Sequence, residues 1–481
     1  MNKKLKKTKI IATLGPASSS KETMLELVKA GVDVFRINFS HADYDLVRRN
    51  VELIREINQE YGYSVSILGD LQGPKLRVGI VKEGSYLNPG DILTFTNENV
   101  EGDSTRVYMT YQQFPQDVKV GERILIDDGK LVLEVIETNL KDTVRAKTIQ
   151  GGPLSSKKGV NLPNTNVSLP ALTEKDIKDA NFILDLELDW IALSFVRHAQ
   201  DIKDLKELIK NHPTNSFKTP IIAKIEKPEG VKNIDEILME CDGIMVARGD
   251  LGVEVPMEEV PVIQKTLVKK ARAYAKPVII ATQMMETMIT SLTPTRAEVN
   301  DVANSVLDGA DAVMLSGETS VGRYPVDVVK NMSKIVKSIE TTNYYYDRNS
   351  ILDNQISCVD ERFITDKICL SAVNIAKSSG AEAIVTLTHS GYTAFQISAH
   401  RPNSHIIVYS ANRRVLTMLN LLWGVRAFYY DMEKTTDETV IQVNMLTCNY
   451  GFVEKGDFVV NLNAMPVHNG GKTNTLRLST I

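Results

Sequence analysis

Cysteines and long hydrophobic runs are scarce in this sequence, and both absences exclude classes of protein. The 481 residues contain four widely spaced cysteines, and no two of them form a Cys-x-x-Cys pair. Zinc ribbons and dithiol redox motifs are therefore excluded, and free thiols in a reducing cytoplasm are expected. No apolar run approaches the roughly 18–20 residues of a membrane-spanning helix. We therefore expect a cytoplasmic protein with no membrane partner.

An excess of positive charge is also missing. The chain has 56 Lys+Arg and 60 Asp+Glu, a net charge of −4, whereas a nucleic-acid-binding protein needs a basic face to neutralise phosphates. We therefore expect no nucleic-acid partner. Lysines are frequent in the first nine residues, but the apolar stretch after them ends at Gly15-Pro16, too early for a signal peptide. This segment predicts a solvated basic tip that includes Lys6, Lys7 and Lys9.

Strand and helix patterns alternate along most of the chain. In the first unit, the capping box Ser19-x-x-Glu22 begins a predicted helix and Gly31 ends it. Eight predicted strands of this kind favour an α/β fold, a closed (β/α)8 TIM barrel. A doubly wound sheet is disfavoured because the first turn lacks a Gly-rich dinucleotide loop. The eight strands are predicted at residues 9–14, 32–38, 64–70, 189–196, 220–225, 243–248, 276–282 and 310–315.

Two segments interrupt this alternation. Short strands separated by turns predict a small β-barrel domain inserted at residues 72–159, which would cover the active face of the barrel as a lid. A polar, linker-like stretch at 341–360 follows the eighth strand, and α/β alternation then resumes. We expect a catalytic barrel at 1–71 and 160–342 and a C-terminal α/β domain at 343–481.

Polar side chains stand at the carboxyl ends of most predicted barrel strands, which form the active face of a TIM barrel. One such residue usually only contacts solvent, but a closed barrel would gather the ends of five or more strands into one mouth. These residues are Arg36, Asn38, Ser40, Asp70, Lys224, Glu226, Arg248, Asp250, Thr282 and Glu318.

Glu226 and Asp250 follow adjacent strands and offer the hard oxygen ligands that Mg²⁺ or Mn²⁺ prefers. Alternatively, these carboxylates form salt bridges with Lys224 and Arg248, and the spacing does not decide between the two. Cations near the same mouth, including Arg36 and Lys224, indicate an anionic substrate such as a phosphate. A metal together with cationic side chains is typical of phosphoryl transfer.

A nucleotide-binding P-loop is absent. The segment Gly470-Gly471-Lys472-Thr473 resembles the end of one, but Pro466 stands where the motif requires glycine.

Five segments closely resemble those of the pyruvate kinase family. They read KIIATLGPAS at 9–18, FRINFSH at 35–41, IAKIE at 222–226, GIMVARGDLG at 243–252 and ADAVMLSGET at 310–319. The resemblance extends in order over essentially the whole chain. It implies an enzyme, usually a homotetramer, that transfers the phosphoryl group of phosphoenolpyruvate to ADP and releases ATP and pyruvate.

The resemblance also implies roles for the matching residues. Glu226 and Asp250 match the Mg²⁺ ligands, Lys224 the group that stabilises the transferred phosphoryl, and Arg36 the arginine that holds the substrate phosphate. Thr282 matches the threonine near the enolate, where we expect a proton relay shared with bound water. Gly249 completes the substrate-binding set, and the expected nucleotide-binding set comprises Asn38, Ser40, His41, Arg77 and Lys158.

A loop in the C-terminal domain carries several hydroxyls before a predicted helix. Such a loop suits a phosphate, although it also fits an ordinary capped helix start. The resemblance implies a sugar-phosphate effector here. His389 and Tyr392 stand where Lys and Arg are frequent in the family, so a tight bisphosphate site is not expected. The expected effector residues are Thr386, Thr388, Ser390, Gly391 and Thr393.

The K⁺ positions of the family are also matched, by Asn38, Ser40, Asp70 and the backbone carbonyl of Leu71. However, Leu71, Gln72 and Lys75 replace the Thr, Lys and Glu of potassium-dependent members, as in the potassium-independent branch. The Lys75 ammonium would supply the charge of K⁺. The alternative is a Lys75 that points to solvent without a role. We expect substantial activity without K⁺.

Two other functions fit part of the pattern. A barrel lyase or aldolase acting on pyruvate or phosphoenolpyruvate would share the metal site but would not need Arg77 and Lys158. A catalytically silent effector-binding or scaffold protein would not need the polar residues of the barrel mouth. ADP-dependent formation of ATP distinguishes both from a kinase.

Overall fold

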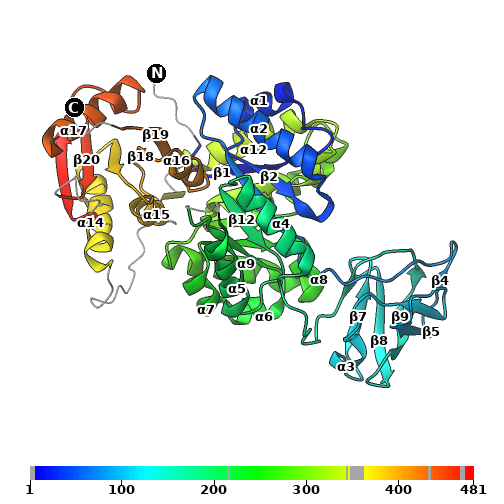
Figure 1. Ribbon diagram of the computed structural model, residues 1–481. Coiled ribbons are helices and arrows are strands. Elements are labelled where there is room, and N and C mark those ends of the chain that lie inside the picture. The colour runs from blue at the N-terminus through cyan, green and yellow to red at the C-terminus, as the bar shows by residue number, and fades with distance from the viewer. Residues whose placement is uncertain (1–5, 214–216, 343–344, 347–361, 432–434, 466–471) are drawn as a thin grey trace.

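A computed structural model describes residues 6–213, 217–342, 345–346, 362–431, 435–465 and 472–481. A central barrel lies between two smaller domains, with the lid on one side and the C-terminal domain on the other (Figure 1). No described helix combines the length and the apolar composition needed to cross a bilayer.

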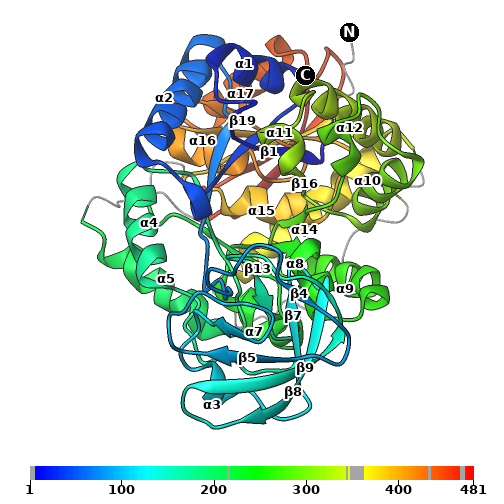
Figure 2. The ribbon, with the colours of Figure 1, turned by 90° about the vertical axis from the view of Figure 1, so that its right-hand side faces the viewer.

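The eight predicted barrel strands are confirmed, and all of their neighbours are parallel. The pairing of Lys9 with Ala312 joins the first strand to the last and closes the barrel. Helices surround this barrel (Figure 2), so its strands are covered on both faces and consist of nearly continuous apolar runs. The strands are β1 (Lys9–Thr13), β2 (Val34–Asn38), β3 (Ser66–Asp70), β12 (Trp190–Leu193), β13 (Ile221–Ile225), β14 (Gly243–Ala247), β15 (Val278–Ala281) and β16 (Ala312–Leu315).

The helices of the barrel begin and end at ordinary capping residues. Thr295 and Glu298 form a capping box at the start of α10, and Gly31 ends α1 as predicted, with a φ of +127°. The predicted start of α1 is wrong by one residue: Ser20 caps it, because the Ser19 hydroxyl donates to the Gly15 carbonyl instead. The larger helices are α1 (Lys21–Ala30), α2 (Tyr44–Tyr61), α4 (Glu174–Asp185), α5 (Ala199–Asn211), α7 (Ile234–Glu240), α9 (Val260–Ala273), α10 (Arg296–Asp308) and α12 (Pro325–Glu340).

The inserted domain has a sheet and a hydrophobic core of its own. Six strands pair in the order β11-β7-β8-β9-β5-β6. Bridges from Arg77 to Gly159 and from Val78 to Met109 connect the two edges of this sheet, which closes it into a small barrel. The six strands are β5 (Ile92–Thr96), β6 (Arg106–Tyr108), β7 (Arg123–Ile126), β8 (Leu131–Thr138), β9 (Thr143–Gln150) and β11 (Val160–Asn161). Two further strands, β4 (Tyr86–Leu87) and β10 (Gly152–Pro153), form a separate antiparallel pair.

The C-terminal domain has the predicted α/β alternation and contains four parallel strands in the order β19-β18-β17-β20. A fifth strand, β21, pairs antiparallel with β20 at the edge and was not predicted. The elements are α14 (Phe363–Ser379), β17 (Ala383–Leu387), α15 (Tyr392–Ala399), β18 (His405–Ser410), α16 (Arg413–Leu419), β19 (Val425–Tyr429), α17 (Thr436–Asn449), β20 (Phe458–Asn463) and β21 (Thr475–Thr480).

The first described lysines are buried, so the prediction of a solvated basic tip is wrong for Lys6, Lys7 and Lys9. They lie between the barrel and the C-terminal domain. The Lys7 ammonium donates to the carbonyl of Asn403 at 2.6 Å, and the Lys9 ammonium donates to that of Val425 at 2.9 Å. The two earlier lysines, Lys3 and Lys4, lie outside the described residues.

The C-terminal domain covers the amino-terminal end of the barrel. Trp190, which begins β12, donates its indole N–H to the carbonyl of Met418 in α16 at 3.0 Å. Tyr345, expected in a polar linker, is instead fully buried and stacks on Trp423 with ring centroids 6.1 Å apart. The greater part of that linker, 347–361, lies outside the described residues. The carboxyl end of the barrel is left to face the lid.

Candidate active site

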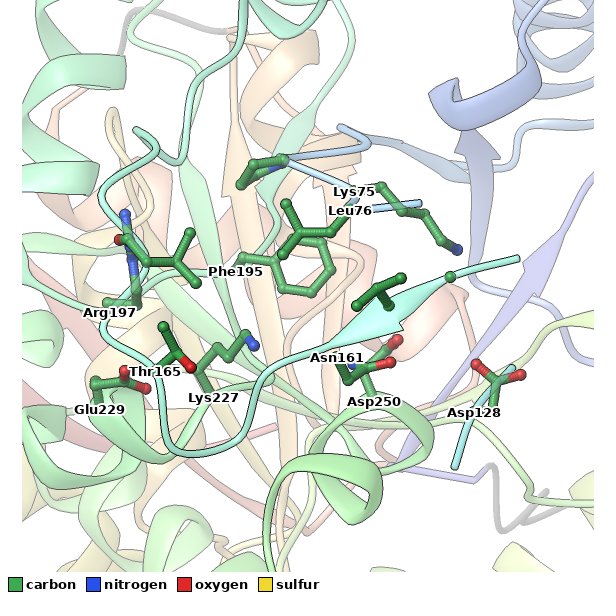
Figure 3. Close-up of a pocket in the computed structure, with 14 residues that line it drawn as sticks. Lys75, Leu76, Asp128, Asn161, Thr165, Phe195, Arg197, Lys227, Glu229 and Asp250 are labelled. Carbon is green, nitrogen blue, oxygen red and sulfur yellow. The ribbon is translucent and has the colours of Figure 1, made fainter. Parts of the chain in front are cut away.

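Charged side chains from neighbouring strands meet at the carboxyl end of the barrel. Arg36 lies in β2 and Asp70 ends β3. Lys224 lies in β13, and Glu226 is the first residue after that strand. Asp250 lies in the first turn of the short helix α8 (Arg248–Glu254), which follows β14. Residues of the lid hinge and of the barrel face one cavity here, among them Lys75 and Asp250 (Figure 3).

Lys224 is the centre of a buried group of alternating charges. Its ammonium lies 3.2 Å from Asp70 Oδ1 and 3.0 Å from Glu226 Oε1. The other oxygen of Asp70 accepts from Arg36 Nε at 2.7 Å, and Arg36 also donates to the Thr13 hydroxyl at 3.0 Å. Asp70 and Glu226 are each 1% exposed. The arrangement holds two cations at fixed positions in a site largely shielded from water, where their charge acts strongly.

The protonation states follow from burial and from these neighbours. Burial favours the neutral form of Lys224, but Asp70 and Glu226 outweigh it and raise the pKa of the ammonium. Burial likewise opposes ionisation of Asp70, but Lys224 and Arg36 outweigh it and lower the pKa of that carboxyl. Lys224 and Asp70 are therefore both charged at neutral pH.

Glu226 differs from Asp70 because a second carboxylate lies nearby. Burial raises the pKa of Glu226, Lys224 opposes the rise, and the negative charge of Asp250 adds to it. Two like charges that destabilise each other are a suitable place for a divalent cation. No group of three or more metal-ligating side chains occurs in the part of the chain that the structure describes. A metal here would rest on these two carboxylates, with open positions for substrate and water.

The salt-bridge alternative holds for one carboxylate and fails for the other. Glu226 does pair with Lys224, whereas Arg248 pairs with Asp301 of α10 instead of Asp250, through two contacts of 2.6 and 2.8 Å. A bidentate pair of this kind fixes the guanidinium plane. Asp250 is thereby left available toward the cavity.

Thr282 follows β15 in a conformation that few β-branched residues adopt, with a φ of +70°. The Arg248 guanidinium donates to the Thr282 carbonyl at 2.8 Å, and the Thr282 hydroxyl accepts from the Gly249 N–H at 2.7 Å. A Cβ at Gly249 would lie 3.2 Å from that hydroxyl, so the close approach favours glycine. These contacts aim the Thr282 hydroxyl and bring three residues of the predicted site together.

Three of the four residues of the expected K⁺ site, Asn38, Asp70 and Leu71, have oxygens with partners within the protein. Asn38 Oδ1 accepts from the Ser40 N–H at 3.1 Å, and the Leu71 carbonyl accepts from the Ser194 hydroxyl at 2.7 Å. Asp70 contacts Arg36 and Lys224, as described above. Lys75 is exposed, and its ammonium has no ion pair within the described ranges.

The two cations expected to bind the nucleotide lie at the base of the lid. Arg77 bridges to Gly159 and donates to the Lys157 carbonyl at 2.8 Å, and Lys158 pairs with Asp127 at 3.0 Å. The two predicted cations are thus placed on adjacent backbone segments. His41 ends a short 3-10 helix, Phe39–His41, but its side chain lies outside the described part of the structure.

The expected effector loop precedes α15 as predicted. Gly391 is the N-cap with a φ of +88°, and its N–H donates to the Thr388 hydroxyl at 2.8 Å. Thr386 and Thr393 are buried, and Thr393 shares a hydrogen bond with Thr473, so these two hydroxyls face the protein interior. Ser390 is exposed.

The sequence analysis missed the end of the fourth barrel strand. Ser194 follows β12, and its hydroxyl accepts from the Lys224 ammonium at 2.7 Å. The next residue, Phe195, donates its backbone N–H to Glu226 Oε2 at 2.8 Å. The strand was predicted at residues 189–196, which placed this corner inside the strand, whereas β12 ends at Leu193.

A second group that the sequence analysis missed joins the lid to the barrel. Glu254 at the end of α8 accepts from Asn161 of lid strand β11 at 2.8 Å and pairs with Lys227 at 2.6 Å. Glu254 is buried, so the contact fixes one hinge of the lid beside the candidate active site.

Comparison with known proteins gives matches along nearly the whole chain. The family model described as "Pyruvate kinase, barrel domain" matches residues 5–329, and the model described as "Pyruvate kinase, alpha/beta domain" matches residues 366–479. A pyruvate kinase from Mycobacterium intracellulare is 42% identical over 474 residues, which cover 98% of each chain. One from Geobacillus stearothermophilus is 42% identical over 478 residues, 99% of this chain and 80% of the relative.

A solved structure agrees with these matches. The crystal structure of a pyruvate kinase from Cryptosporidium parvum superposes with a TM-score of 0.91 at 35% identity, and the match covers 99% of this chain and 96% of the other. The family models, the relatives and the fold all point the same way, and the chain belongs to the pyruvate kinase family.

Proposed function

We propose that the chain transfers the phosphoryl group of phosphoenolpyruvate to ADP, giving ATP and pyruvate. The observation that carries this proposal is the buried Lys224 between Asp70 and Glu226 at the barrel mouth, with Arg36 beside it. The test is a coupled assay of pyruvate formation from phosphoenolpyruvate with and without ADP. ATP must appear in step with pyruvate; pyruvate formed without ADP would mean that the phosphoryl group passes to water instead, and no turnover would favour a lyase of another substrate or a silent protein.

Glu226 and Asp250 would hold Mg²⁺, or Mn²⁺ in its place. Carboxylate oxygens suit either ion, and the rise in the pKa of Glu226 that Asp250 helps to cause supports a shared cation. When bound, the ion would neutralise charge on the substrate oxygens. The Phe195 N–H holds Glu226 in place for this task.

The chain's own cations would act on the phosphoryl group. Arg36 would hold the phosphate of the substrate, and Lys224 would stabilise the charge that spreads over the phosphoryl oxygens during transfer. The negative charges of Asp70 and Glu226 raise the pKa of Lys224, so the ammonium is charged when the substrate arrives. Gly249, whose N–H donates to the Thr282 hydroxyl, would lie beside the bound substrate. The Thr282 hydroxyl would take part, with bound water, in the proton relay to the methylene carbon of the enolate.

The nucleotide would lie between the barrel mouth and the base of the lid. Arg77 and Lys158 would neutralise its phosphates, and their placement on adjacent segments supports this. The remaining contacts are proposed for the segment after β2, which comprises Asn38, Ser40 and His41.

Lys75 would replace K⁺ as the monovalent charge. The oxygens of Asn38, Asp70 and Leu71 already have internal partners, and the Lys75 ammonium has no competing ion pair among the described residues. Lys75 also lines the same cavity as Asp250 (Figure 3). A tethered ammonium brings its charge without loss of binding entropy in each cycle.

A phosphorylated sugar would bind at the loop before α15, and four copies of the chain would assemble as a homotetramer. The exposed Ser390 and the start of an eight-residue helix support the first proposal. Light scattering tests the second, and a mass other than four times 53.5 kDa would overturn it.

A further inference from the structure

The corner after β12 contacts both members of the central ion pair. Ser194 Oγ lies 2.7 Å from the Lys224 ammonium, and the next backbone N–H, that of Phe195, lies 2.8 Å from Glu226 Oε2. Ser194 is 1% exposed. Phe195 has a φ of +55°, a conformation that a bulky side chain rarely adopts outside functional sites. The corner is thus built around these two contacts.

The Ser194 hydroxyl uses its single proton in a hydrogen bond to the backbone. It is donated to the Leu71 carbonyl at 2.7 Å, so the oxygen can only accept from Lys224. Leu71 is itself held across the barrel sheet, because its N–H donates to the Ala192 carbonyl at 3.0 Å. Ser194 therefore connects the Lys224 ammonium to the backbone of β3 and β12.

Three oxygens lie close to the Lys224 ammonium. The contact with Ser194 is the shortest at 2.7 Å, and those with Glu226 and Asp70 are 3.0 and 3.2 Å. A phosphoryl oxygen that approaches Lys224 must displace one partner. Glu226 would hold a metal and Asp70 also pairs with Arg36, so the charges around both carboxylates would change when metal and substrate bind. Ser194 is the neutral partner that can remain.

We propose that Ser194 is a positioning residue that holds the Lys224 ammonium in place while its other contacts exchange during phosphoryl transfer. This inference rests on the proposed role of Lys224. Ser194 itself does not touch the reacting atoms. Its loss should therefore lower kcat much more than it raises KM for phosphoenolpyruvate.

The first experiment compares steady-state kinetics of Ser194→Ala, Ser194→Cys and the parent chain with phosphoenolpyruvate, ADP and Mg²⁺. A hydrogen bond to a charged group corresponds to roughly 10- to 100-fold in rate, and we expect kcat to fall by this factor. Cysteine fills the volume but is a weak acceptor, so Ser194→Cys should lose activity as Ser194→Ala does. Normal activity in Ser194→Cys would assign Ser194 to packing alone and overturn the proposal.

Ser66→Ala is the matched control. Ser66 is a fully buried serine in the adjacent strand β3, and its hydroxyl has no hydrogen-bond partner in the described part of the chain. We expect unchanged kinetics for this variant. The Mg²⁺ activation curve of Ser194→Ala should also be unchanged, because the Phe195 backbone still holds Glu226. Kinetics of Ser194→Ala equal to those of Ser66→Ala would overturn the proposal.

A double-mutant cycle separates this inference from the proposed function. If Ser194 acts through Lys224, adding Ser194→Ala to Lys224→Met should cause no further loss of kcat. A further tenfold loss would show that Ser194 acts elsewhere. If Lys224→Met alone keeps full activity, the failure lies with the proposed role of Lys224.

Discussion

Lys224 and Glu226 lie two residues apart at the end of β13, on the same face of the strand, and their side chains are 3.0 Å apart in a buried site. The period of two in a strand places both toward the barrel mouth. One residue supplies the positive charge proposed for the phosphoryl group, and the other the negative charge proposed for the metal. The pairing raises the pKa of the Lys224 ammonium and opposes the rise that burial causes in the pKa of Glu226.

Lys224→Met should remove most phosphoryl transfer and keep Mg²⁺ binding. Loss of one electrostatic stabiliser lowers turnover by about 10²–10³-fold, whereas the carboxylates remain. The measurement is kcat together with a Mg²⁺ titration. The control is Lys232→Met, which removes an exposed lysine of the barrel. Turnover near that of the parent would contradict the assignment of Lys224.

Asp250→Asn should weaken activation by Mg²⁺. The amide keeps the shape of the carboxylate but lacks its charge, so the Mg²⁺ concentration for half-maximal activity should rise by at least about tenfold. Asp128→Asn is the control, because Asp128 lines the same cavity from the lid. An unchanged Mg²⁺ titration in Asp250→Asn would remove Asp250 from the metal site.

The parent chain should be active with Mg²⁺ in a buffer free of K⁺ and NH₄⁺, with a bulky organic cation for ionic strength. Lys75→Glu should then make activity depend on K⁺, because it replaces a positive charge with a negative one. Lys147→Glu changes the charge of an exposed lid residue and should have no such effect. Parent activity that collapses without K⁺ and returns with it would refute the proposed role of Lys75.

A sugar monophosphate should alter the phosphoenolpyruvate saturation curve if the loop before α15 binds it. Ser390→Asp places a negative charge at this exposed position and should abolish the response. Ser371→Asp, on the exposed face of α14, serves as the control and should keep it. Mono- and bisphosphate sugars are compared. No response of the parent to any phosphate ester would exclude the effector site.

Stability should fall in mild acid because a buried histidine stays neutral in the fold. Burial, with Arg272 and Arg401 adding to it, lowers the pKa of His400 from 6.5 to about 4. The unfolded chain takes up a proton below pH 6.5 and the folded chain does not, so the free energy of unfolding decreases from pH 6.5 toward pH 4. Asp189, whose pKa burial raises to about 6, acts in the opposite direction.

The difference between variants isolates the histidine from the aspartate. Between pH 6.5 and 5, the free energy of unfolding of His400→Gln should fall less steeply than that of the parent, by up to about 1.4 kcal/mol per pH unit. The measurement is the thermal midpoint of both proteins as a function of pH. His198→Gln removes an exposed histidine and should keep the parent slope. Equal slopes in His400→Gln and the parent would contradict a neutral buried His400.

Much of the fold follows from local pattern. Parallel barrel strands are buried on both faces, so their sequences are runs of apolar residues. A polar residue then indicates the carboxyl end of a strand, at the barrel mouth. Arg36, Asp70, Lys224 and Glu226 could therefore be placed at one site from the sequence. The Ser194-Phe195 corner could not, because a serine after an apolar run looks the same whether it caps a strand or holds a lysine.

The sequence by itself determined the eight βα units, the inserted and C-terminal domains, and the family. Tertiary structure decided the partners of the charges. Lys6, Lys7 and Lys9 form a basic stretch in sequence, yet all three are buried. Lys6 pairs with Asp33, whereas Lys7 and Lys9 donate to backbone carbonyls of the C-terminal domain. Arg248 and Asp250 are neighbours in sequence, yet Asp301 of α10 takes the arginine and leaves the carboxylate for the cavity. Pairing energies depend on distance and burial between segments far apart in the chain, and only the folded barrel sets those distances.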